Sequence, residues 1–251
     1  MTRLRRTVIA HFYNEEYLLP WWLANHTRLF DHGVLINYGS TDRSVEIIRQ
    51  FAPRWEIRDS RNEYFDSISA DREVMDIEQE FDGWKMALNI TEFFRCKDID
   101  LFLQQVEQSG HQACAIRSAI MVDPLDIPLP PLSLSHHLFQ QRYYGFIELG
   151  HTRSRVIHRF PNGYYHIGRH STAHPHQVNP PGAMLLWYAF SPWTEETKKR
   201  KLQIKTRMPP SGSFGGYQHW WGPDELEQQY QGTALHAVDL RKDTEYFNLC
   251  F

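Results

Sequence analysis

The first half of the chain alternates short apolar runs with amphipathic segments of helical period, and this order constrains the fold more than any other feature. Residues 7–12 and 33–38 are short apolar runs, which is typical of buried strands. Residues 15–30 and the segment that ends at Pro53 space apolar side chains three or four positions apart, which is typical of helices. Strands that alternate with helices form parallel sheets. The sequence therefore predicts an α/β, Rossmann-like fold: a mostly parallel sheet with helices on both faces and a C-terminal extension.

The same order continues with strands at 55–59 and 84–90 and a helix near 68–81 between them. Polar side chains follow three of the strands, and they are Tyr13, Asn14 and Glu15, then residues 37–42, then residues 89–92. Within 37–42, Thr41 or Asp42 can cap the helix that follows. Because parallel sheets bind ligands beyond the carboxyl ends of their strands, these three polar tips predict a binding site at one edge.

Composition excludes several classes of protein. Of the 251 residues, 41% are hydrophobic and 23% are charged, with a net charge of -3, so the chain is neither disordered nor a general nucleic-acid binder. Three cysteines without paired or metal-type spacing suit a reducing compartment. The N-terminus does not read as a signal peptide, and no apolar run reaches the roughly 20 residues of a membrane span. We expect a cytoplasmic protein, and contact with a membrane surface remains open.

The stretch at residues 8–48 reads VIAHFYNEEYLLPWWLANHTRLFDHGVLINYGSTDRSVEII. It resembles the opening of family 2-type nucleotide-sugar glycosyltransferases, which have the GT-A fold, and the match in order and spacing covers about the first 95 residues. The resemblance implies a pocket for a UDP-type donor. It places Tyr13, Asn14 and Glu15 beside the nucleobase and ribose, Asn37 at the base, and Asp42 in support of the loop, and Ser40 is a further expected nucleotide-binding residue. Taken singly, each motif also reads as a helix start or a turn.

In that family the fourth strand ends in Asp-x-Asp, whose carboxylates hold Mn²⁺ or Mg²⁺ against the donor diphosphate. This chain has Asn89 and Thr91 at those positions and keeps Glu92. Three interpretations remain: Glu92 anchors a cation that arrives with the diphosphate, arginines, histidines and backbone N–H groups stabilise the phosphates without metal, or only binding remains. An amide and a hydroxyl are weak ligands for a hard cation, so no metal is expected at the ligand-free tip.

The segment before this tip carries seven acids: Asp66, Asp71, Glu73, Asp76, Glu78, Glu80 and Asp82. Asp71 and Glu78 share a helix face with Val74 and Met75. That face either points its carboxylates toward the missing metal site or, as such acids more often do, lies in solvent.

Residues 113–122 read as one strand, and Asp123 follows it. The resemblance implies that Asp123 deprotonates the acceptor hydroxyl, with Asp126 as a substitute and Glu92 as the other catalytic carboxylate. An ordinary turn before Pro124 explains Asp123 equally well.

Residues 154–176 read as two strand-like runs joined by a turn at residues 161–163. In the second run His166 and His170 would share one face. No Cys or Glu completes a zinc site there. The resemblance implies that a late histidine contacts phosphate or metal, which makes His170 or His174 the candidate.

The C-terminal part predicts a strand at 184–190 and a helix from Thr194 whose basic run, residues 198–201, faces solvent, anionic lipid or diphosphate. A glycine-rich segment at 212–216 precedes Trp220 and Trp221, which suit either stacking on a sugar or packing.

The sequence therefore predicts a nucleotide-sugar-binding half, residues 1–130, and an acceptor side with a C-terminal extension, residues 131–251, in one domain. The predicted function is transfer of a sugar from a nucleotide-sugar donor to a glycan, lipid or other hydroxyl acceptor in cell-surface polysaccharide synthesis. The alternative is an inactive nucleotide-sugar or glycan-binding protein of the same fold. A histidine-based metal hydrolase lacks a ligand motif. The expected cofactor is Mn²⁺ or Mg²⁺ bound with the donor, or none.

Overall fold

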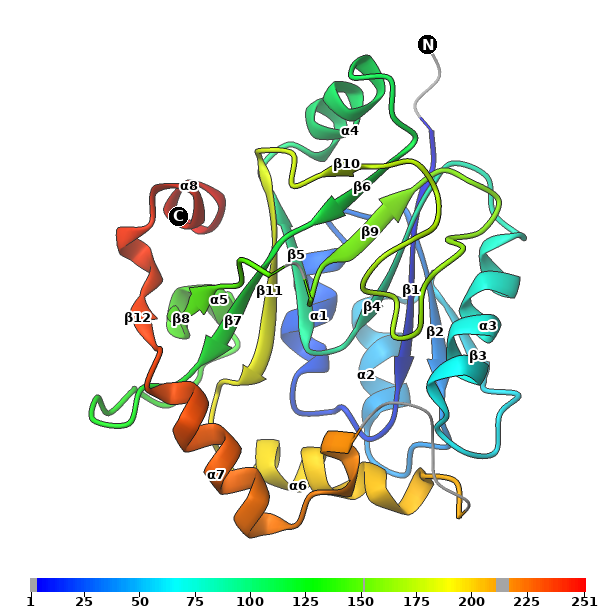
Figure 1. Cartoon of the computed structure of the whole chain (residues 1–251). Coiled ribbons are helices and arrows are strands. Elements are labelled where there is room, and N and C mark those ends of the chain that lie inside the picture. The colour runs from blue at the N-terminus through cyan, green and yellow to red at the C-terminus, as the bar shows by residue number, and fades with distance from the viewer. Residues whose placement is uncertain (1–3, 151, 211–216) are drawn as a thin grey trace.

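A seven-stranded sheet forms the centre of the molecule (Figure 1). The structure is a computed structural model that describes residues 4–150, 152–210 and 217–251. The sheet has the order β10-β6-β9-β4-β1-β2-β3. Its strands are β1 (Arg6–Phe12), β2 (His32–Asn37), β3 (Glu56–Asp59), β4 (Trp84–Asn89), β6 (Ala113–Ile116), β9 (Arg155–His158) and β10 (Gln177–Val178). The first four strands are parallel, and only β9 runs antiparallel to its neighbours β4 and β6. The predicted α/β class with a mostly parallel sheet is confirmed.

Helices cover both faces of this sheet, as the alternation along β1 requires. Val8 and Ala10 belong to the core that also contains α1 (Leu19–His26), α2 (Ser44–Phe51) and α4 (Ile99–Gln108). Ile9 points to the opposite face and packs with Val74 of α3 (Ser67–Glu78). Successive side chains of a strand alternate between faces, so one apolar strand supplies two cores.

A second sheet joins the two halves of the chain. It has the order β12-β8-β7-β11-β5, and its strands are β5 (Glu92–Cys96), β7 (Ser118–Val122), β8 (Tyr144–Ile147), β11 (Ala183–Phe190) and β12 (Val238–Asp239). Strand β11 pairs with both β5 and β7, and β9 lies between β4 and β6 in the first sheet. Both sheets therefore contain strands from either side of residue 130.

The described ranges contain four more helices: α5 (Leu138–Gln141), α6 (Glu195–Gln203), α7 (Pro223–Ala234) and α8 (Thr244–Cys250). Short 3-10 turns cover Ile204–Arg207, Tyr217–Trp220 and Leu240–Lys242. Helix α6 begins as predicted, with the Thr194 hydroxyl accepting from the Thr197 N–H. In Figure 1, α6 lies at the edge toward which the arrowheads of β1 and β2 point. None of the helices in the described ranges is long and apolar enough to cross a membrane.

Two predicted strands were wrong. Residues 113–122 form β6 and β7, which belong to different sheets and are separated at Arg117, and hydrophobicity alone cannot show such a change of sheet. After β9, residues 164–173 form a loop held by one bridge between Tyr165 and Thr172. Gly168 and Arg169 have left-handed φ angles of 86° and 60°, which an extended strand excludes.

The predicted cap of α2 was also only partly right. Arg43 is the N-cap residue, and its side chain makes no capping hydrogen bond. The Asp42 carboxylate accepts from the Ser44 N–H at 3.0 Å, so it stabilises the first turn from the position before the N-cap. The three cysteines, Cys96, Cys114 and Cys250, are buried and free.

Candidate functional site

A cavity of about 360 Å³ lies at the carboxyl ends of β1 and β4. Tyr13 and Glu15 line it after β1, and residues 89–92 line it after β4. Its other walls come from distant segments, including Asp71 of α3, Trp187 of β11, the α6 residues Arg200, Lys201 and Gln203, and His219 and Trp221 near α7. Two of the three predicted strand tips therefore meet at one cavity, as parallel α/β topology requires.

The tip of β1 is fixed by hydrogen bonds from several directions. Asn14 has a left-handed φ of 50°, and its side-chain oxygen accepts from the Thr41 N–H at 2.7 Å. The Asn14 backbone N–H donates to the Ser40 hydroxyl at 3.0 Å. The buried Glu15 carboxylate accepts from Arg200 Nε at 2.5 Å and from Arg200 Nη2 at 2.7 Å. Glu15 therefore faces the cavity already paired with a guanidinium of α6.

The tip of β2 lies beside the cavity and braces its loop. The Asn37 side-chain oxygen accepts from the Ser40 N–H at 2.9 Å, while the Asn37 amide donates to Asp59 at 3.2 Å. Asp42 accepts from the Glu16 N–H at 3.0 Å in addition to its bond with Ser44. Asn37, Ser40 and Asp42 are not among the cavity-lining residues. The role of Asp42 in the nucleotide site stays a prediction.

At the tip of β4, Glu92 is fully engaged. Arg155 Nε donates to Glu92 Oε2 at 2.8 Å and Arg155 Nη2 donates to Oε1 at 2.6 Å, and both side chains are at most 3% exposed. The Asn89 N–H donates to the same carboxylate at 2.7 Å. Burial raises the pKa of Glu92, but the Arg155 charge and these hydrogen bonds outweigh it, so the pKa lies below the ordinary value. Glu92 is thus a charged group with its lone pairs largely occupied.

The other residues of this tip do not form a cation site either. The Asn89 side-chain oxygen accepts from Arg169 Nη2 at 3.2 Å, and Thr91 is buried. Asp71 pairs with Arg169 at 3.1 Å and accepts from the Gly168 N–H at 2.7 Å. Divalent cations need several unengaged oxygen ligands at one point. Within the described ranges, no three His, Cys, Asp or Glu side chains form a group that could hold a metal ion. The residues therefore do not fit the Mn²⁺ or Mg²⁺ that the resemblance implies.

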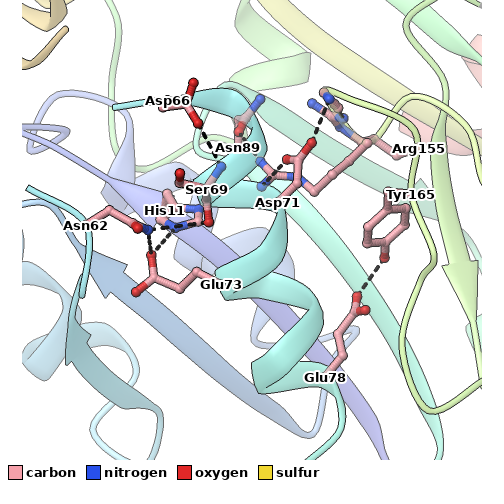
Figure 2. A network of polar contacts seen from close by, with 12 residues as sticks. His11, Asn62, Asp66, Ser69, Asp71, Glu73, Glu78, Asn89, Arg155 and Tyr165 are labelled. Carbon is pink, nitrogen blue, oxygen red and sulfur yellow. Dashed lines mark hydrogen bonds and ion pairs between the residues drawn. The ribbon is translucent and has the colours of Figure 1, made fainter. Parts of the chain in front are cut away.

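Three acidic side chains of α3 are buried in the protein and do not face solvent. Asp71, Glu73 and Glu78 are buried, and Figure 2 shows Glu73 directed at His11 and Glu78 directed at Tyr165. His11 Nε2 lies 3.0 Å from Glu73 Oε2, and the Tyr165 hydroxyl donates to Glu78 at 2.6 Å. Burial raises the pKa of Glu73, yet hydrogen bonds from His11 and its neighbours hold it at about 2. The solvated interpretation was wrong for these three acids, whose carboxylates bind protein donors.

The two candidate histidines lie in different environments. His170 lines the cavity, and its Nε2 lies 3.5 Å from Arg153 Nη1. Burial and the nearby Arg155 charge lower its pKa to about 3, so its imidazole is neutral at physiological pH. His174 stacks on Phe160 at 3.9 Å and does not line the cavity.

Asp123 lies outside the cavity lining. Its carboxylate accepts from the Ser191 hydroxyl at 2.6 Å and from the Trp193 N–H at 2.8 Å, and it lies 3.6 Å from Arg142 Nε. Burial raises its pKa. These bonds hold the turn between β11 and α6, and the role of Asp123 as a base stays a prediction.

Most of the cationic side chains that line the cavity were not predicted from the sequence. Five cations line the cavity, namely Arg153, Arg155, Arg169, Arg200 and Lys201, against three carboxylates, Glu15, Asp71 and Glu92. The basic run in α6 was assigned chiefly to solvent, and that assignment was wrong for Arg200 and Lys201. The sequence analysis had also offered diphosphate as a partner of this run, and that alternative could have identified Arg200 and Lys201. No local pattern in the sequence indicated that Arg153 or Arg155 lines a cavity. The glycine-rich segment at 212–216 lies outside the described residues, whereas Trp221 lines the cavity.

No protein-family model matches the sequence, and no curated protein matches it. Among solved structures, S. aureus TarS is 11% identical over 98% of this chain and 45% of its own length, with a TM-score of 0.44. TarS 1-349 in complex with UDP-GlcNAc is 11% identical over 91% of this chain and 72% of that chain, with a TM-score of 0.43. Glucosyl-3-phosphoglycerate synthase from Mycobacterium tuberculosis, in complex with Mn²⁺, UDP and glucosyl-3-phosphoglycerate, is 12% identical over 47% of this chain and 44% of that chain, with a TM-score of 0.33. The chain thus spans less than half the length of the full TarS chain.

Proposed function

We propose that this chain binds a nucleotide-sugar donor and transfers the sugar to a hydroxyl acceptor. The observation that carries the proposal is the cavity at the ends of β1 and β4, which combines aromatic side chains with an excess of cations. Tyr13, Trp187 and Trp221 supply ring faces for a base or a sugar, and Arg153 and Lys201 supply charge for phosphate. The whole protein carries a net charge of -3, so the positive cavity is a local feature.

The resemblance at residues 8–48 supports the same assignment, with UDP as the expected nucleotide. Asn37, Ser40 and Asp42 would then shape the rim of the nucleotide site through the loop they brace. A glycan or lipid acceptor, cell-surface polysaccharide synthesis and a cytoplasmic location with peripheral membrane contact remain parts of this proposal.

A second candidate function is nucleotide-sugar binding without transfer. The observation that favours it is the state of the carboxylates: Glu15, Asp71 and Glu92 are each paired with an arginine, and Asp123 lies outside the cavity. An inverting transfer needs a base within hydrogen-bond reach of the acceptor hydroxyl. Within the described residues, no carboxylate that lines the cavity lacks an arginine partner.

The test is a panel of UDP-sugars, measured for binding by calorimetry and for turnover by release of UDP. Binding with turnover supports the transferase, binding without turnover supports the binding protein, and no binding overturns both. Asp123→Asn separates the roles of that residue. If Asp123 is the base, the variant binds UDP normally and loses most turnover, by about 10²-fold or more.

A further inference from the structure

In the described part of the chain, two cations of the cavity have no carboxylate partner. Arg155, Arg169 and Arg200 each pair with Glu92, Asp71 or Glu15. Arg153 and Lys201 make no ion pair with any carboxylate of the described residues. When Lys201 is protonated, these two single charges equal the formal charge of one divalent ion.

Both unpaired cations rest on aromatic rings of β11. The Arg153 guanidinium lies 4.8 Å from the centre of the Trp187 ring, and Lys201 Nζ lies 4.4 Å from the centre of the Phe190 ring. Such contacts hold a cation in place without neutralising its charge. Arg153 reaches this wall from the loop before β9, and Lys201 reaches it from α6. One strand, β11, therefore supplies the ring that each of these two cavity-lining cations contacts.

The tip of β4 does not provide a site for a metal ion. Glu92 and Asn89 direct their oxygens at Arg155 and Arg169. A cation placed there would have to displace buried charge-assisted hydrogen bonds and would lie next to two guanidinium groups.

We propose that Arg153 and Lys201 bind the diphosphate of the donor directly, in the role that the resemblance assigns to a divalent cation. This inference rests on the proposed function, because it assigns the phosphate subsite of the same cavity. Each phosphate of a nucleotide-sugar diphosphate carries one negative charge, so two fixed cations neutralise it. Fixed cations of this kind also stabilise the charge that develops on a departing nucleotide.

The titration of Lys201 adds a second readout. Burial, and next the Arg200 charge, lower the Lys201 pKa to about 7, with Arg153 acting in the same direction and Glu15 opposing them. His219, the other titratable group beside it, has a pKa lowered to about 4 by burial and is neutral above pH 6. A bound anion favours protonated Lys201. The affinity of the wild-type protein, relative to a variant whose cation stays charged, therefore falls as the pH rises from 6 to 8.

The experiment measures UDP binding by calorimetry in EDTA and again in Mn²⁺. We expect the two affinities to agree within about twofold. Arg153→Gln and Lys201→Gln should each weaken binding about tenfold, the factor that about 1.4 kcal/mol represents. Arg153→Lys should retain most of the affinity. Lys199→Gln, which removes an exposed charge from the same helix, should change nothing. Lys201→Arg should lack the loss of affinity between pH 6 and pH 8.

Each outcome decides the proposal. If UDP binds only with Mn²⁺, the direct-contact proposal is overturned while the nucleotide function stands. If UDP binds in neither condition, the proposed function falls, and inorganic pyrophosphate in EDTA tests the cation site by itself. Pyrophosphate binding that Arg153→Gln and Lys201→Gln weaken supports the site, and no pyrophosphate binding overturns it. Unfolding midpoints of the variants show whether a loss of binding reflects a loss of folding.

Discussion

Two glutamate–arginine pairs flank the cavity, and they differ in how deeply the protein encloses them. Glu92 and Arg155 are 3% and 2% exposed and belong to strands of different sheets, β5 and β9. Glu15 and Arg200 are 9% and 18% exposed and join a loop to α6. Breaking a buried pair leaves a charge that water cannot reach, whereas a more exposed charge regains solvent. Removing one partner of the first pair should therefore cost much stability, whereas the second pair mainly positions α6 over the cavity.

The largest effect should follow from Arg155→Met, which leaves Glu92 buried without its cation. We expect the free energy of unfolding in urea to fall by about 3–5 kcal/mol. The double variant Arg155→Met with Glu92→Leu should recover most of this loss, because it removes both charges. If the double variant is no more stable than Arg155→Met alone, the isolated charge is not the cause.

Protonation of Glu92 in acid should reduce the free energy of unfolding less than Arg155→Met does. The Glu92 pKa is lowered in the folded protein. Ionised Glu92 therefore contributes to the free energy of unfolding above its ordinary pKa of about 4.3, and this contribution is lost as the pH falls through the pKa of the folded state. Glu92→Gln should flatten the decline of stability in this acidic range, as followed by urea unfolding at a series of pH values. An unchanged slope would show that other carboxylates, such as Glu73, dominate acid unfolding.

Arg200→Met tests the more exposed pair. We expect a loss of about 1 kcal/mol in the free energy of unfolding, because Glu15 can regain water. UDP affinity should also fall, and by more than this loss of folding stability explains, since α6 also carries Lys201. A loss as large as that of Arg155→Met would show that the two pairs are energetically alike and would remove the comparison.

The smallest effect is expected from Asn37→Ala at the rim. Asn37 is half-buried and accepts one hydrogen bond from the Ser40 N–H. Stability should fall by only about 0.5–1 kcal/mol. UDP binding should weaken modestly if the braced loop shapes the nucleotide site, and calorimetry on this variant measures that effect. Affinity equal to that of the wild type would place the nucleotide elsewhere along the cavity.

Several features of the site could be predicted because they depend on neighbours in sequence. The strands of residues 7–12 and 84–90 and the turn at Asn14 follow from local patterns, and parallel topology then brings their ends together. The Thr194 cap is likewise a local property. The environment of the basic run that follows Thr194 is not a local property. Helical periodicity shows which side chains are neighbours on the helix, but not what the helix packs against.

The α/β order, the strand ends and the amide and hydroxyl side chains of Asn89 and Thr91 could be read from the sequence. Two contacts appear only in the folded chain: Glu92 meets Arg155, 63 positions later, and Glu15 meets Arg200, 185 positions later. Strand and helix periods record interactions over a few residues, whereas charge pairing depends on which distant segments the two sheets bring together. For that reason Asn89 and Thr91 could be read in the sequence, and the cations around them were visible only in the folded chain.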